Sequence, residues 1–171
     1  FADVLAAASS NANTNVSMLG ESFKYVAPLA GTLGYTAEDT SIALGLMANA
    51  GIKGSQAGTS LKTALARMSA PTAKQAAAMK KLGISLTDSE GNMKSLRDVM
   101  GDLRTSFAGM SESEQAAAAS TIFGKEAMSG MLAIINASES DFDKLTAAID
   151  GSAGAAERMA AVRVAKLEGD I

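Results

Sequence analysis

The glycine-rich stretch at residues 48–65 has the composition of a phosphate-binding loop. It reads ANAGIKGSQAGTSLKTAL, with a lysine between its first two glycines and a Thr-Ser pair after its third. In a nucleotide-binding P-loop, four residues separate two glycines, and lysine followed by serine or threonine comes directly after. Counting from Gly51 places Gln56 where the second glycine is needed, and counting from Gly54 places Thr59 there. The spacing therefore fails to match a P-loop in either register.

Two other interpretations of this stretch remain. GIKG, residues 51–54, matches the GXXG loop that joins two helices in KH domains and clamps a nucleic-acid backbone. A KH fold also needs a three-stranded sheet, and no strand pattern precedes the loop. In the simpler interpretation, Gly51 ends one helix in the left-handed conformation, and Gly54 and Gly58 let the next helix start close to its neighbour. We favour this second interpretation, in which the loop joins packed helices.

A short acidic stretch imitates the start of a calcium-binding loop. Asp88, Glu90 and Asn92 have the spacing of the first three ligands of such a loop. The sixth position, which needs glycine, is Met93, and the twelfth, which needs glutamate, is Val99. The stretch is better explained as a solvated turn.

Most residue types that enzymes use are missing or scattered. The chain has no cysteine and no histidine, which excludes thiol nucleophiles, disulfides, thiolate zinc sites and imidazole catalysis. Lys125 and Glu126 are adjacent, so on a helix their side chains point in different directions and form no catalytic pair. We therefore predict no catalytic, cofactor-binding or metal-binding residues, no cofactor, no small-molecule substrate and no enzymatic activity.

The composition indicates what kind of elements would position these residues. The 171 residues suffice for one domain with a core, and 47% are hydrophobic, although aromatic residues reach only 4%. Alanine and methionine supply much of this fraction, which suits helices packed closely through small side chains. A net charge of −3 argues against an extended nucleic-acid surface. No apolar run reaches the roughly 18 residues of a membrane span.

Hydrophobic periodicity predicts an all-α fold, an irregular bundle of about eight or nine short helices. Proline at position 28 should kink or divide a helix near residues 16–33. Residues 84–94 alternate apolar and polar side chains around a turn-forming cluster, which predicts one small β-hairpin or extended loop. An apolar face near residues 128–135 is assigned to the core rather than to a partner groove. The strongest apolar stripe consists of Leu96, Val99, Met100, Leu103 and Phe107. Three helix N-caps are predicted at Thr36 with Asp39, Ser111 with Glu114, and Ser138 with Asp141.

We interpret residues 1–171 as a single helical module and as a fragment of a longer protein. The N-terminal segment lacks a starting methionine and a basic region before its apolar part, so it is not typical of a signal peptide. Residues 1–14 and 150–171 are expected to belong to helices that continue into the parent chain, the latter after a glycine-rich joint.

Three blocks of the sequence resemble the core region of phage tail tape measure proteins. Their order and spacing also match that family, and the similarity covers about residues 15–149. The strings NAGIKGSQAGT and FGKEAMSGM carry it most specifically. The blocks are YVAPLAGTLGYTAEDTSIALGLMANAGIKGSQAGTSLKTALARMSAPT, MKKLGISLTDSEGNMKSLRDVMGDLR and EQAAAASTIFGKEAMSGMLAIINASESDFDKL.

The resemblance implies a structural component of a phage or prophage-derived tail. Such proteins are long, mostly helical chains that lie in several copies inside the tail tube, set its length during assembly and leave it when DNA is ejected. Other copies of the chain, the tail tube protein, tail assembly chaperones and tail tip or baseplate proteins are the expected partners. The expected locations are the virion, inside the tube, and the host bacterial cytoplasm during assembly. Because glycines and turns interrupt this segment, we expect a folded module within the ruler.

Two alternatives come from other functional classes. Residues 116–135 are moderately apolar, which would suit a segment that contacts the host membrane, or transiently DNA, during passage through the envelope. Lys125 and Glu126 divide that stretch, so it would lie at the membrane surface at most. Some family members carry peptidoglycan-cleaving domains elsewhere, but no pair of facing carboxylates is evident in this sequence.

Overall fold

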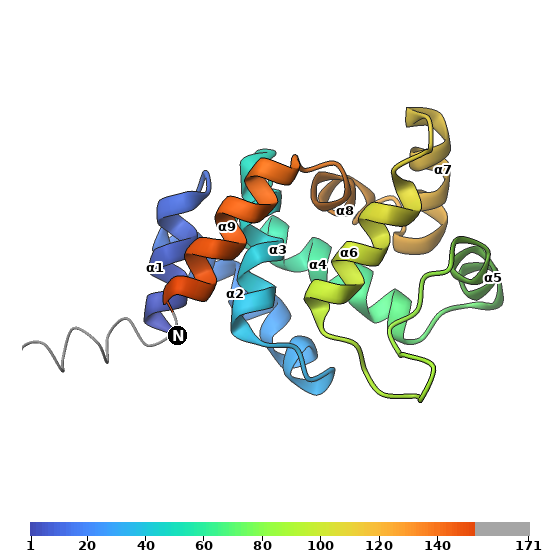
Figure 1. The fold of residues 1–171 in the computed structure, drawn as a ribbon, viewed down its shortest axis with the longest axis horizontal. Coiled ribbons are helices and arrows are strands. Elements are labelled where there is room, and N and C mark those ends of the chain that lie inside the picture. Colours follow the sequence, from blue (N-terminus) through green and yellow to red (C-terminus); the bar gives the residue numbers. More distant parts are fainter. Residues whose placement is uncertain (153–171) are drawn as a thin grey trace, which may run out of the picture.

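Nine α-helices build residues 1–152, the part of the chain that the computed structural model describes. No strand occurs among these residues, so the predicted all-α bundle is confirmed. Figure 1 shows short helices that cross one another at varied angles instead of running in parallel. The helices are α1 (Ala2–Asn11), α2 (Val16–Thr32), α3 (Ala37–Asn49), α4 (Gly54–Ser69), α5 (Ala73–Leu82), α6 (Leu96–Phe107), α7 (Glu112–Phe123), α8 (Met128–Ile135) and α9 (Glu139–Ser152).

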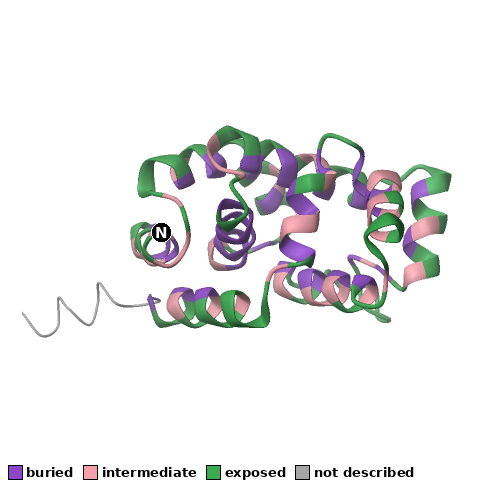
Figure 2. Ribbon diagram, turned by 90° about the horizontal axis from the view of Figure 1, so that it is seen from above, coloured by how far each residue is buried: buried purple, intermediate pink, exposed green. Residues whose placement is uncertain are grey.

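Helix α3 is the centre of the fold. Residues 39–48 are all buried, and α1, α2, α4, α6, α8 and α9 contact this helix. Its sequence mixes Ile, Leu and Met with Ala, Gly, Ser and Thr, so no side of it is strongly polar. A helix of that kind is expected inside a protein, surrounded by other helices. Figure 2 shows the buried residues gathered toward the middle of the molecule and the exposed ones outside.

The predicted apolar stripe of α6 is confirmed. Its five residues, from Leu96 to Phe107, are all buried and face the core. The ring of Phe107 stacks on Phe123 of α7 with 6.5 Å between ring centroids. This spacing of three and four residues is the pattern that places side chains on one side of a helix. The stripe therefore fixes which side of α6 faces inward.

The predicted N-caps are present. The hydroxyl oxygens of Thr36, Ser111 and Ser138 each accept the backbone N–H three residues further on. At Thr36 the reciprocal half of the predicted capping box is replaced by another interaction. The Asp39 carboxylate accepts hydrogen bonds from the backbone and side chain of Arg97 instead. This carboxylate therefore joins α3 to α6.

Pro28 does not divide a helix, contrary to one of the predicted outcomes. Helix α2 runs without interruption from Val16 to Thr32. Proline has no N–H to donate, which removes one bond from the helix. Val26 and Ala30, two positions before and after it, are buried in the core, while Pro28 itself is exposed. Packing of this buried side, largely against α4, keeps the helix in one piece.

Residues 84–94 form an extended loop. Among the described residues of this stretch, one isolated antiparallel bridge joins Thr87 to Met93, and no strands form. The expected alternation is nevertheless visible, because Ile84 and Leu86 are buried while their neighbours face outward. These two side chains attach the loop to the bundle.

The two ends of the described part lie side by side. Helix α1 packs against α9, and the N-terminus lies at the same end of the molecule as the C-terminal end of α9 (Figure 1). Helix α9 continues through Asp150 and Gly151 to Ser152, where the sequence predicted the start of a glycine-rich joint. The helix predicted after that joint lies outside the described residues.

Candidate functional site

The glycine joint between α3 and α4 is closed by its own backbone. Gly51 follows the last turn of α3 with a φ of +88°, the left-handed conformation predicted for it. Its N–H donates to the carbonyl of Ala48 at 2.9 Å, and the N–H of Ile52 donates to the carbonyl of Met47 at 3.0 Å. These two bonds satisfy carbonyls that a helix end otherwise leaves free. The predicted helix terminus is confirmed.

The beginning of α4 lies unusually close to α2. The hydroxyl of Ser22 donates to the carbonyl of Gly54 at 2.6 Å. A Cβ atom added to Gly58 would collide with the backbone carbonyl of Ser22. The structure therefore confirms the predicted close approach of helices at Gly58. At Gly54 an added Cβ would meet nothing within 4 Å, and the glycine is explained instead by its φ of +60°. The KH interpretation is wrong, because no sheet surrounds this helix pair in the described part of the chain.

Missing Cβ atoms bring other helices together in the same way. A Cβ on Gly45 of α3 would lie 2.6 Å from Cδ2 of Leu145 in α9. A Cβ on Gly130 of α8 would lie 3.0 Å from Cβ of Ser60 in α4. A larger residue at either position would require its neighbour to shift, which the flexible end of Leu145 can do more easily than the Cβ of Ser60. Small residues thus set several helix–helix distances in this core.

The acidic turn is organised by hydrogen bonds within the loop. Oδ1 of Asp88 accepts the backbone N–H of Glu90 at 2.9 Å and that of Asn92 at 3.0 Å. An aspartate that closes a turn in this way is common in loops. Across the described residues, no group of three or more acidic, histidine or cysteine side chains is placed to hold a metal ion.

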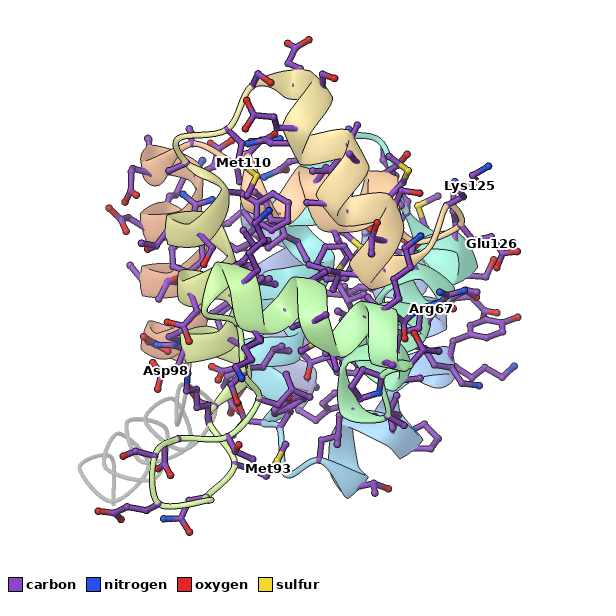
Figure 3. The ribbon with its side chains drawn as sticks, turned by 90° about the vertical axis from the view of Figure 1, so that its right-hand side faces the viewer. Arg67, Met93, Asp98, Met110, Lys125 and Glu126 are labelled. Carbon is purple, nitrogen blue, oxygen red and sulfur yellow. The ribbon has the colours of Figure 1, made fainter. Side chains whose placement is uncertain are left out.

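Lys125 and Glu126 lie in the turn between α7 and α8 and point outward (Figure 3). Both are exposed, and they do not converge on a common point. The neighbouring Gly124 has a φ of +84°, and a Cβ there would lie 2.7 Å from the guanidinium carbon of Arg67. The following apolar face belongs to the core as predicted, because Met131 is buried and Met128 packs against the core.

A charged cluster that the sequence did not reveal joins three helices. Arg97 at the start of α6 contacts Asp39 of α3 through Nε at 3.1 Å. Its two terminal nitrogens donate to both carboxylate oxygens of Asp150 in α9, at 2.8 and 2.9 Å. This hydrogen bond to Arg97 lowers the pKa of Asp150, and the same bond raises the pKa of Arg97. A paired, two-point contact of this kind is the strongest arginine–carboxylate geometry.

A second arginine of α6 reaches the other end of α9. Arg104 lies seven residues after Arg97, on the same side of the helix. Its guanidinium donates to the carbonyl of Ile134 at 2.8 Å and lies 4.9 Å from the ring centroid of Phe142. It also lies 3.6 Å from the carboxylate of Glu139. Together the two arginines hold both ends of α9.

The surface hollows of the described part are shallow and differ in character. One of about 480 Å³ beside α6 is polar and is lined by Asp88, Asp98 and Asp102 together with Lys94 and Arg97. Two others are mainly apolar. The largest, about 650 Å³, lies between α5 and the 84–94 loop, and Met68, Met79 and Ile84 are among its lining residues. A second hollow of about 420 Å³ lies on the other side of α5, against α7. Neither brings acidic groups together. No helix among the described residues is long and apolar enough to cross a membrane.

Comparison with known proteins assigns the chain to a family. The sequence model of the phage-related minor tail proteins matches residues 1–124, well over half of the chain. The chain belongs to the phage-related minor tail protein family. The matched region contains the glycine joint, the close contact between α2 and α4, and the charged residues Asp39 and Arg97.

Two curated proteins that the chain resembles are named as tape measure proteins. The chain is 43% identical over 159 residues to the tape measure protein of Pneumococcus phage Dp-1, which covers 93% of the chain and 14% of that relative. It is 33% identical over 171 residues to the probable tape measure protein of Escherichia phage P2, covering 98% of the chain and 21% of that relative. The resemblance to tape measure proteins is thus confirmed. The chain spans only a small part of these relatives, and no solved structure matches it.

Proposed function

We propose that this chain is a folded module of a tape measure protein, which sets the length of the tail tube during assembly and leaves the tube when DNA is ejected. The observation that carries the proposal is the 43% identity to a named tape measure protein over 93% of the chain. The fold supports a mechanical role, because close glycine contacts and arginine ion pairs hold its helices together. We also propose that residues 1–171 form a single helical module and that this module catalyses no reaction.

The proposed partners follow from a position inside a tail. They are other copies of this chain, the tail tube protein, tail assembly chaperones and tail tip or baseplate proteins. The protein would be in the host bacterial cytoplasm during assembly and inside the tube in the virion. Chemical crosslinking of intact tails, followed by mass spectrometry of peptides from α1 to α9, tests this arrangement. Crosslinks to the tube protein and between copies of the chain support it, and crosslinks to capsid proteins alone contradict it.

The length-setting role is tested with in-frame deletions in the helical regions of the parent gene that flank this module. A helix rises about 1.5 Å per residue, so a ruler predicts that tails shorten in proportion to the residues removed. Tail lengths are measured by electron microscopy of negatively stained particles. Tails of unchanged length in deletions of different size would contradict the role.

The release step has its own test. Peptides from residues 1–152 are quantified by mass spectrometry in intact particles and in particles triggered to eject their DNA. The proposal predicts that these peptides are lost from the emptied tails while tube protein remains. Full retention after ejection contradicts release.

The membrane alternative would require the module to unfold. The apolar side chains of residues 116–135 are divided between α7 and α8, and Ile122, Phe123 and Met131 are buried in the core. In the folded chain they are therefore not available to a bilayer. Leakage of dye from lipid vesicles on addition of the folded chain would favour the alternative, and intact vesicles would favour the purely structural role.

A further inference from the structure

We propose that α9, together with α1, opens before the central helices α2, α3 and α4 unfold, and that the α6 arginines regulate this opening. The biological role of this opening rests on the proposed function, because a folded chain that leaves a narrow tube has to unfold, and one part of it unfolds first. The opening itself concerns the chain alone and is tested on the chain alone.

Few side chains attach α9 to the core. Leu145 and Ile149 are its two fully buried apolar residues. By contrast, α2 buries Leu19, Phe23 and Val26, mostly against α4. Burial of apolar surface is the main stabilising contribution in folding, so α9 is held less firmly than α2. The free energy of opening is expected to differ between helices in the same way.

Helices α1, α3 and α9 also contain buried, unsatisfied polar atoms. The hydroxyl oxygens of Ser9 in α1, Ser41 in α3 and Thr146 in α9 are buried and have no hydrogen-bond partner among the described residues. These three helices contact one another. Burying a hydroxyl without a partner costs free energy, and opening of α1 and α9 would return these groups to water. The contact of the two terminal helices with α3 is therefore weakened.

Polar contacts from α6 compensate for this weakened contact. Helix α6 reaches α9 through the long side chains of Arg97 and Arg104, which contact Asp150 and Glu139 near opposite ends of α9. The Asp150 side chain is half exposed, at 50%. Ion pairs at such positions are sensitive to salt and can be broken without disturbing the core. They are suited to act as a latch on α9.

The position of α1 and α9 determines which helices separate first when the two ends are pulled. The N-terminus and the C-terminal end of α9 lie together (Figure 1), so a pull applied at these two ends separates α1 and α9 first. The central helices α2, α3 and α4 remain folded behind them. Within the proposed tape measure protein, this makes the module yield in a defined order that begins at its two terminal helices.

Native-state hydrogen exchange of the 171-residue chain, read by mass spectrometry, tests the order of opening. The test variant is Asp150→Asn, which breaks the α9 side of the cluster while leaving Asp39 with Arg97. The matched control is Asp102→Asn, which makes the same chemical change at another ion pair of α6, 2.8 Å from Lys94. Peptides of α9, α1 and α4 are compared.

The proposal predicts that wild-type α9 and α1 exchange well before α4. Asp150→Asn should accelerate exchange in α9 roughly two- to fivefold, which corresponds to one exposed ion pair. Asp102→Asn should leave α9 unchanged. Molar salt should accelerate α9 exchange more in the wild type than in Asp150→Asn, where only the Arg104–Glu139 pair remains among the described ion pairs of α9. If α9 exchanges together with α4, or if Asp102→Asn accelerates α9 as much as Asp150→Asn does, the proposal is wrong; this outcome would leave the tail role untouched.

Discussion

At the scale of single residues, missing side-chain atoms position α4 on α2. Gly58 has no Cβ, and the backbone carbonyl of Ser22 lies where that atom would be. The Ser22 hydroxyl then reaches the carbonyl of Gly54. The pattern of glycines predicted a close approach of two helices. It could not identify Ser22 as the partner of Gly58, because these residues are 36 positions apart and Ser22 has no distinctive sequence context.

Substitution of Gly58 by alanine should therefore destabilise the fold. We expect a loss of about 1–3 kcal/mol in the free energy of unfolding, because a backbone atom rather than a flexible side chain has to move. Gly20→Ala is the matched control, since Gly20 lies in α2 with open space around its Cβ position. The control should gain about 0.5–1 kcal/mol from alanine's higher helix propensity. Urea unfolding followed by circular dichroism measures both, and equal effects would contradict the close-packing account.

Tyr35 is a second residue with a specific expectation. Its hydroxyl is buried and has no hydrogen-bond partner in the described part of the chain, and burial raises its pKa from 10.0 to about 12. Because the folded state holds this proton more tightly than the unfolded state, its contribution to stability is complete below pH 10 and lost as the pH rises through about 12.

Tyr35→Phe should thus be as stable as the wild type or more stable at neutral pH, because it removes an unpaired buried hydroxyl. It should also lack the part of the alkaline destabilisation that Tyr35 causes. Urea midpoints measured from neutral pH to about pH 12 provide the test, with Tyr25→Phe as control, since Tyr25 is exposed. An alkaline loss that is unchanged in Tyr35→Phe would show that another group causes it.

At the scale of elements, the sequence predicted those features of helices that depend on residues close together in the chain. The α6 stripe and the helix end at Gly51 follow from spacing and backbone conformation, and both are present. The fate of Pro28 was not predictable locally, because packing of α2 against α4 decides it. The Arg97 cluster was hidden for a similar reason: its partners Asp39 and Asp150 are 58 and 53 residues away.

Acid should loosen α9 selectively. Contact with Arg97 lowers the pKa of Asp150 below its usual 3.8, so ionised Asp150 stabilises the fold above about pH 4 and this contribution is lost as the pH falls. The difference in urea midpoint between the wild type and Asp150→Asn should shrink between neutral pH and about pH 3. A difference that stays constant over this range would show that the ion pair contributes nothing to the stability of the folded chain.

At the scale of the whole molecule, the described part is organised around the buried helix α3, and its two ends lie together. A module of this shape adds little to the length of a ruler in proportion to its number of residues. Only its fold class could be predicted, because hydrophobic periodicity does not show which helices contact one another in space. Membership of the minor tail protein family places this compact unit within a class of tail components.

The most direct test of this account is the tail length of a phage whose tape measure gene lacks the codons for residues 1–152 of this module. An equal deletion from a continuous helical region of the same gene serves as the control. For 152 residues, the control should shorten tails by about 230 Å, at about 1.5 Å per residue. The account predicts that deletion of the module shortens tails by a small fraction of that distance. Shortening by the full 230 Å, measured by electron microscopy, would contradict a folded module.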